Sequence, residues 1–166
     1  MPAIPVRADR ALEREYPEVD SRASDCIINI WRTHAMLLEV MARLLRPHDL
    51  TLTGFRVVLM TRIAGGRMSP AEIAERLGSS RATVTGVVDS LEKRGFVRRD
   101  PDPEDRRRLQ VAVTDDGRAM LEGLLPTFFT CERETVAQLD AAEQEQLVEL
   151  LAQVQRGLLA MLDSDG

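Results

Sequence analysis

The chain is poor in cysteine and in aromatic residues, and it has no long apolar run. Its 166 residues include only two cysteines, Cys26 and Cys131, which are too few and too far apart to form a disulfide framework. No apolar stretch approaches the roughly 18 residues of a membrane-spanning helix, and the N-terminus lacks the apolar core of a secretory signal. These absences exclude several classes and lead us to expect a globular, cytoplasmic protein.

The patterns that enzymes and metal sites require are also missing. His34 and His48 are the only histidines, so even with Cys26 the three or four close ligands of a zinc site are lacking. There is no phosphate-binding loop and no nucleophile constellation. We therefore expect no catalytic residue, no metal ion and no cofactor.

Acidic residues dominate the chain as a whole, but not the segment from Arg62 to Arg108. The formal net charge is −5. Residues 62–108 hold eleven basic and eight acidic residues, whereas the rest of the chain holds eleven basic and nineteen acidic residues. Because phosphate binding depends on local charge, this distribution is typical of a nucleic-acid footprint on one face. A charged, solvated face would give the same pattern, so the excess is weak evidence alone.

Apolar residues at three- and four-residue spacing predict a long helix near each end of the chain. One runs from Asp20 to Arg46 and the other from Leu139 to Leu162. At about 1.5 Å per residue, the first would be about 40 Å long, more than a domain of this size needs to cover its own core. We expect something else to pack on it, with the last helix as its natural mate.

Capping residues and glycines divide the middle of the chain into short helices. Thr53 is the expected N-cap of a helix over residues 54–63. Ser69 and Glu72, three residues apart, spell a capping box that starts the next helix, which ends at Gly78.

A third helix is expected over residues 80–94, capped by Ser79 or Ser80. Its inward positions are Val84, Val87, Val88 and Leu91. The residues left facing outward near its start are three hydroxyl residues and one arginine, namely Ser80, Arg81, Thr83 and Thr85. Hydroxyls suit phosphate oxygens, and an arginine can pair with guanine in the major groove. The alternative interpretation is that these residues only cap the helix or face solvent.

A basic hairpin is predicted after the third helix. Residues 96–99 and 109–113 read as two strands joined by a charged, proline-rich turn. The turn ends with Arg106, Arg107 and Arg108, which stand opposite Arg98 and Arg99. We expect Asp105 to orient Arg107 for a narrow minor groove; in the alternative, the charges of a solvated turn pair among themselves.

The run from Leu52 to Gly117 resembles the MarR family of bacterial transcriptional regulators. The resemblance rests on SPAEIAERLGSSRATVT in the helix-turn-helix, LEKRGFVRR and DPEDRR around the hairpin, and VTDDG after it. It implies a mainly α fold, in which a winged helix-turn-helix with a two-stranded β wing is flanked by long N- and C-terminal dimerisation helices. It also implies a homodimer on a pseudo-palindromic operator of double-stranded DNA, usually a repressor that a small molecule or an oxidant releases.

On this reading the chain has four segments. Residues 1–19 form an N-terminal extension, 20–50 a dimerisation helix, 51–113 the winged helix-turn-helix DNA-binding domain and 114–166 the C-terminal dimerisation helices. The expected DNA-binding residues are Ser69, Ser80, Arg81, Thr83, Thr85, Arg98, Asp105, Arg106, Arg107 and Arg108.

The resemblance also suggests an effector site. Family ligands are often aromatic acids, bound between the dimer helices and the winged domain. The candidates here are an aromatic ring, two guanidiniums and an imidazole: Trp31, Arg32, His34 and Arg56. We weigh this against a core position for Trp31 and an interface position for His34.

Three features depart from family patterns. Gly86 stands where many members carry a basic or polar residue, so an operator sequence cannot be transferred. Leu12 replaces the tryptophan of the urate-responsive branch. Cys26 lies near the sensing cysteine of a peroxide-responsive branch, but with one tyrosine in the chain we expect a small buried hydrophobic residue.

Two other classes of function stay open. A winged helix that contacts protein would be an adaptor without DNA binding, and it would show little salt-dependent affinity for duplex DNA. An enzyme is the third class, and no motif supports it.

Overall fold

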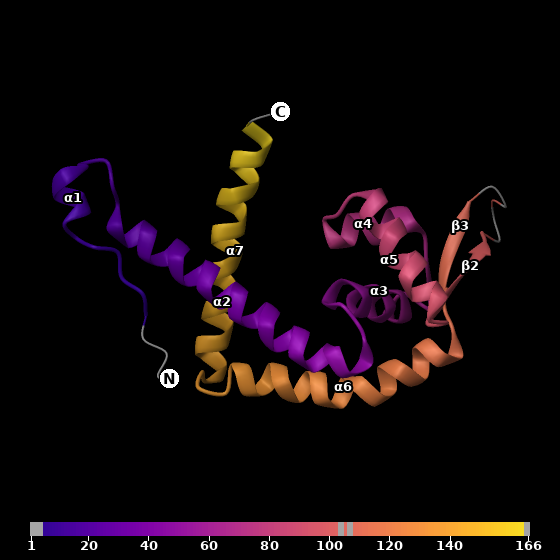
Figure 1. Cartoon of the computed structure of the whole chain (residues 1–166). Helices are drawn as coiled ribbons and strands as arrows, with labels where there is room; N and C mark the ends of the chain where they lie inside the picture. Colours follow the sequence, from indigo (N-terminus) through magenta and orange to yellow (C-terminus); the bar gives the residue numbers. More distant parts are fainter. Residues whose placement is uncertain (1–4, 103–104, 106–107, 165–166) are drawn as a thin grey trace. The chain divides into compact units, whose positions relative to one another are not determined.

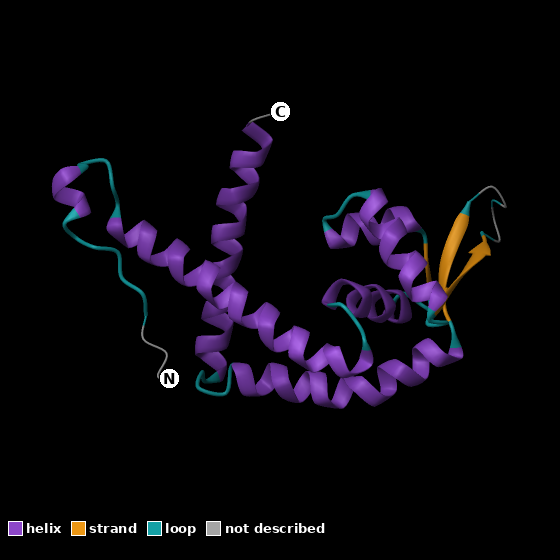
Figure 2. Ribbon diagram, viewed as in Figure 1, coloured by secondary structure: helices purple, strands orange, loops and turns teal. Residues whose placement is uncertain are grey.

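The computed structural model describes residues 5–102, 105 and 108–164, and consists of helices with one small antiparallel sheet (Figures 1 and 2). The chain divides into two compact units, Met1–Arg118 and Ala119–Gly166. None of the helices in the described residues is long and apolar enough to cross a membrane. In order, the elements are α1 (Leu12–Glu15), α2 (Ser21–Leu45), the 3-10 helix η1 (Arg46–His48), α3 (Leu52–Ile63), β1 (Arg67–Met68), α4 (Pro70–Leu77), α5 (Arg81–Lys93), β2 (Val97–Pro101), β3 (Leu109–Val113), α6 (Asp115–Thr135) and α7 (Ala141–Ser164).

Helix α2 confirms the long helix predicted near the N-terminus. The Asp20 carboxylate caps it by accepting the N–H groups of Arg22 and Ala23. Only the C-terminal end of α2 packs on α3, where Met41 and Leu45 are buried. Much of its apolar side is exposed within the single chain, so the core of the chain leaves this helix largely uncovered.

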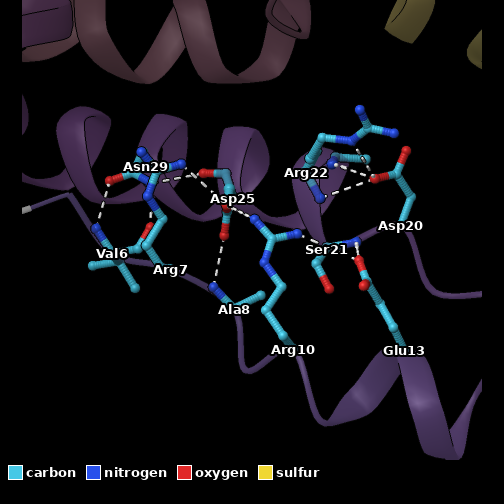
Figure 3. Close-up of polar contacts among 11 residues, drawn as sticks. Val6, Arg7, Ala8, Arg10, Glu13, Asp20, Ser21, Arg22, Asp25 and Asn29 are labelled. Carbon is cyan, nitrogen blue, oxygen red and sulfur yellow. Dashed lines mark hydrogen bonds and ion pairs between the residues drawn. The ribbon is translucent and has the colours of Figure 1, made fainter.

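The N-terminal segment lies along the first turns of α2 (Figure 3). Asp25, buried on α2, accepts the N–H of Ala8 at 2.6 Å and pairs with Arg7 and Arg10, each at 3.1 Å. The N–H of Ala8 is the main cause of the lowered pKa of Asp25, and the two guanidiniums add to it. The extension is thus tied to α2 by a buried carboxylate.

Helix α3 begins two positions earlier than predicted. Thr51, in extended conformation, accepts the N–H of Gly54 at 3.0 Å, so the assignment of Thr53 as N-cap was wrong. Phe55 and Val58 are buried as expected. Ile63 was also expected in the core but is 75% exposed, because it lies about 140° around the helix from Val58.

The sheet has three strands rather than two, in the order β1-β3-β2. Strands β2 and β3 form the predicted hairpin, with Val97 opposite Val113 and Arg99 opposite Val111. The unpredicted strand β1 pairs Met68 with Val111 on the other edge of β3. A two-residue strand is too short to give an alternating pattern, which is why the sequence did not indicate it.

Local capping sets the starts of α6 and α7. Thr114 accepts the N–H of Gly117 at 3.0 Å, and α6 then continues through Pro126. Asp140 and Glu143 cap α7 reciprocally, each carboxylate accepting the other residue's N–H at 2.9 Å. No residue of α7 is buried in the described chain. Most of its apolar stripe is therefore exposed within the single chain.

Candidate nucleic-acid interface

Helices α4 and α5 form the helix-turn-helix, and short-range contacts set its geometry. The capping box at Ser69 is complete: Ser69 Oγ accepts the N–H of Glu72 at 3.2 Å, and the Glu72 carboxylate accepts the N–H of Ser69 at 2.8 Å. Hydrogen bonds from the Ser69 hydroxyl and N–H lower the pKa of Glu72. Gly78 ends α4 in the left-handed region (φ 61°), a conformation that glycine adopts without a steric cost. The sharp turn lets α5 follow at once.

The hydroxyl residues at the start of α5 are already bonded to one another or to the backbone. Ser80 Oγ accepts the N–H of Thr83 at 3.1 Å and lies 2.9 Å from the Thr83 hydroxyl. The Thr85 hydroxyl donates to the carbonyl of Arg81 at 2.9 Å. All three hydroxyl residues are exposed, and each hydroxyl oxygen keeps acceptor or donor capacity beyond these bonds.

Arg81 is the exposed cation of this helix start. Its guanidinium forms no hydrogen bond or ion pair with any residue that the structure describes. Further along α5, Val84, Val88 and Leu91 are buried, as predicted, while Val87 is only half-buried. The outward side of α5 at Gly86 is open, since an added Cβ there would meet nothing within 4 Å.

Arg98 lies on the exposed side of the wing. Its Nε donates to both oxygens of Asp100, at 2.9 and 3.1 Å, and Arg67 pairs with the same carboxylate at 3.2 Å. This ion cluster joins β1 to β2, and Asp100 holds the Arg98 side chain in place. Both guanidiniums are about half exposed and so retain contact with solvent.

Arg99, the next residue of β2, points to α5 instead. Its guanidinium donates to Asp89 at 2.5 Å and to Glu92, and its N–H donates to Glu92 Oε1 at 3.0 Å. Burial would lower the pKa of Arg99, but the hydrogen bonds to the two carboxylates more than offset this and raise it. Sequence reasoning placed Arg98 and Arg99 together, although the two-residue repeat of a strand puts neighbours on opposite faces.

The turn of the wing is organised by two aspartates. Asp102 accepts the side-chain amide of Gln110 at 2.6 Å and the N–H of Asp105 at 3.3 Å. Asp105 is half-buried and pairs with exposed Arg108 at 3.5 Å. Arg106 and Arg107 lie outside the described residues, so the predicted pairing of Asp105 with Arg107 stays a prediction.

The four effector candidates are spread over two helices. Trp31 is 69% exposed, which excludes the core position considered for it within the single chain. His34 and Arg56 are exposed and Arg32 is half-buried. An open cavity of about 460 Å³ lies where α2 meets α3, lined by Leu38, Ala42, Arg46, Asp49, Leu50, Thr51 and Leu52. None of the four candidates lines this cavity.

The exposure of Cys26 differs from the expectation of a buried residue. Cys26 is exposed rather than buried, because the first half of α2 has few partners besides the N-terminal segment. Cys131 is half-buried on α6. No group of three or more His, Cys, Asp or Glu side chains able to hold a metal ion occurs among the described residues.

Comparison with known proteins agrees with this geometry. The MarR family model matches residues 50–109. The transcriptional repressor MprA of Escherichia coli K12 is 32% identical over 128 residues, which is 76% of this chain and 70% of MprA.

Two solved structures extend the comparison. The Escherichia coli MarR variant C80S complexed with operator DNA is 30% identical, with a TM-score of 0.64 over 77% of this chain and 94% of that one. Bordetella bronchiseptica BpsR, whose DNA binding is regulated by 6-hydroxynicotinic acid, is 28% identical. Its TM-score is 0.67, and the match covers 76% of this chain and 89% of the BpsR chain. The chain described here therefore belongs to the MarR family of transcriptional regulators.

Proposed function

We propose that this protein is a repressor that binds a pseudo-palindromic operator as a homodimer and leaves it when a small aromatic acid binds. The observation that carries the proposal is the start of α5, where the side chains of Arg81, Thr83 and Thr85 are all exposed and the Thr85 hydroxyl donates to the backbone carbonyl of Arg81. A helix start that offers hydroxyls and a cation suits phosphates and guanine edges in the major groove. The repressor function of MprA and the operator complex of the MarR variant support this assignment.

We assign the remaining DNA contacts to the α4 cap and the wing. Ser69 would contact the backbone at the start of α4, and Arg98 and Arg108 are the exposed cations of the described wing. Asp105, Arg106 and Arg107 complete the set on sequence grounds. Arginines at a hairpin tip fit the strong negative potential of a narrow minor groove.

Dimerisation would cover the apolar side chains that the single chain leaves exposed. Helices that each expose so many large apolar side chains are unusual on a monomer and are typical of an interface. On this proposal, segments 20–50 and 114–166 are the dimerisation helices, and a two-fold axis places two α5 helices about 34 Å apart, one turn of DNA. The exposed residues concerned are Trp31, Met36, Leu37, Leu38 and Val40 on α2, and Leu147, Val148, Leu150, Leu151, Leu158, Leu159, Met161 and Leu162 on α7.

The proposed effector is an aromatic carboxylic acid. We assign its ring to Trp31 and its carboxylate to Arg32 or Arg56, with His34 beside them. The regulation of BpsR by 6-hydroxynicotinic acid supports this class of ligand. An acid that binds only a dimer with altered wing spacing would weaken DNA binding by its differential affinity for the two states.

DNA binding is tested by titrating the protein with duplexes that it selects from a random library, at several salt concentrations. We expect a steep loss of affinity with rising salt concentration. Arg81→Ala should weaken binding by about 1–3 kcal/mol and relax the sequence preference at the base that Arg81 contacts. Arg14→Ala, which removes an exposed arginine from the N-terminal extension, is the control and should bind as the wild type does. A wild-type protein that selects no duplex, or binds without salt dependence, would favour the adaptor.

Effector binding is tested in the same assay. A panel of benzoic and nicotinic acids is added to the complex, and release by one of them is expected. Either Arg32→Ala or Arg56→Ala should abolish that release without changing DNA affinity. If Arg46→Ala abolishes it and neither of these variants does, the acid occupies the cavity between α2 and α3 instead of the site proposed.

A further inference from the structure

Arg99 joins the wing to α5 through both its guanidinium and its backbone N–H. Its guanidinium reaches Asp89 at 2.5 Å and also Glu92, while its N–H donates to Glu92 Oε1 at 3.0 Å. The side chain is only 23% exposed, far less than the 52% of Arg98. Planar guanidinium groups that bridge two carboxylates are geometrically well defined. The polar contacts of Arg99 are therefore made within the winged helix-turn-helix itself.

The two carboxylates lie on the same stripe of α5 as Arg81 and Thr85, two of the proposed DNA contacts. Arg81, Thr85, Asp89 and Glu92 follow one another at spacings of four, four and three residues, which places them along one side of the helix. The first half of the stripe carries Arg81 and Thr85, and the second half holds Arg99. The wing is thus anchored beside the surface that would read DNA.

Strand geometry places the side chains of Arg98 and Arg99 on opposite faces of the wing. Successive side chains of β2 point to opposite faces, so Arg98 pairs with Asp100 on the exposed face while Arg99 reaches α5. Residues Val97–Pro101 of β2 pair with Leu109–Val113 of β3, so that the hairpin moves as one piece. A bond between Arg99 and α5 consequently acts on the whole hairpin, together with the pairing of β3 with β1.

We propose that Arg99 is a positioning residue, which fixes the wing against α5 through Asp89 and Glu92 and so sets DNA affinity without touching DNA. The inference rests on the proposed function. It makes a counter-intuitive claim: the acidic side chains Asp89 and Glu92, although they lie on a helix that faces a polyanion, strengthen binding.

The test uses the double variant Asp89→Asn/Glu92→Gln in the full-length protein. It removes two negative charges near DNA but leaves Arg99 and an acceptor for its N–H. If the carboxylates act only through their charge, the variant binds duplex DNA more tightly. If the carboxylates position the wing, the double variant binds duplex DNA at least about tenfold more weakly. The slope of log affinity against log salt concentration then becomes shallower by more than about one per wing, because several phosphate contacts are lost together.

Arg98→Ala is the matched control on the neighbouring position. It keeps the bonds of Arg99 to α5, so the slope should fall by about one per wing at most. Arg99→Lys keeps the charge but cannot bridge both carboxylates, and it should lie between wild type and the double variant. Amide hydrogen exchange in β2 and β3 should be faster in the double variant than in Arg98→Ala, whether or not DNA is present.

The outcomes separate the two proposals. Wild-type binding together with equal or tighter binding by the double variant overturns the positioning role and leaves the proposed function intact. A wild-type protein that captures no duplex overturns the proposed function and this inference with it. If the double variant does not fold, weakened binding by Arg99→Lys with a reduced slope supports the inference, and an unchanged slope overturns it.

Discussion

Asn29 pairs with both backbone polar groups of Val6 (Figure 3). Its Oδ1 accepts the N–H of Val6 at 3.1 Å, and its Nδ2 donates to the Val6 carbonyl at 2.8 Å. A side-chain amide presents the same donor and acceptor as a neighbouring strand would, so the extended segment is bound to α2 as if to a sheet edge. Together with Asp25, Asn29 makes the N-terminal segment part of the folded unit.

Replacement of Asn29 by alanine should release this segment locally. Two hydrogen bonds to Val6 are lost, at about 1 kcal/mol each, while the core around Phe55 is untouched. We expect faster hydrogen exchange at Val6 and Ala8 and faster tryptic cleavage after Arg7 and Arg10, with little change in melting temperature. A segment that stays equally protected would contradict the pairing.

The docking of the segment should also depend on pH through Asp25. Because the N–H of Ala8 and the two arginines lower its pKa in the folded state, the carboxylate contributes stability at neutral pH. That contribution starts to fall as the pH drops below about 4, and it is gone once the pH has passed through the lowered folded pKa. The Ala8 amide resonance reports the titration, and its midpoint should lie below the ordinary value for aspartate. Asp25→Asn should abolish the transition, and a midpoint at or above that value would argue against the contact.

Gly117 is required by a close approach of two backbone segments. A Cβ at this position would lie 2.1 Å from the carbonyl oxygen of Phe96, so the first turn of α6 or the start of β2 would have to move. We expect Gly117→Ala to destabilise the protein by about 1–3 kcal/mol in urea unfolding.

Gly123, in the same helix, is the matched control for that experiment. An added Cβ there meets nothing within 4 Å, so Gly123→Ala should be neutral or stabilise the helix by up to about 1 kcal/mol. Equal effects of the two substitutions would show that helix propensity, rather than the contact with Phe96, decides both.

The proposed dimer predicts that α7 tolerates charge on one side only. Leu151 and Leu158 are 38% and 52% exposed and lie on the apolar stripe, seven residues apart. The double change Leu151→Glu and Leu158→Glu should give monomers or unfolded chain by light scattering, because the charges would be buried between copies. Gln153→Glu, on the opposite side of α7, should leave the oligomer unchanged. A folded dimer of the double variant would remove α7 from the interface.

Contacts made within a helical turn could be predicted from the sequence alone. Ser69 and Glu72, Gly78 and the Ser80 cap are as expected, because three-residue spacing brings a cap and its amide together in any helix. The MarR family motifs and the wing hairpin followed from equally local patterns.

Contacts between distant segments had to await the tertiary structure. Four findings depend on how separate elements come together. They are strand β1, the exposure of Ile63 and Cys26, the ion pairs of Asp25 with Arg7 and Arg10, and the ion pair of Arg99 with Asp89. Sequence determined the main helices, the hairpin of β2 and β3 and that the middle of the chain is a winged helix-turn-helix, since these depend on short-range spacing. Tertiary packing alone decided which of two adjacent arginines faces solvent and which holds the wing to α5, because both have the same chemistry and differ only in the side of the strand on which they lie.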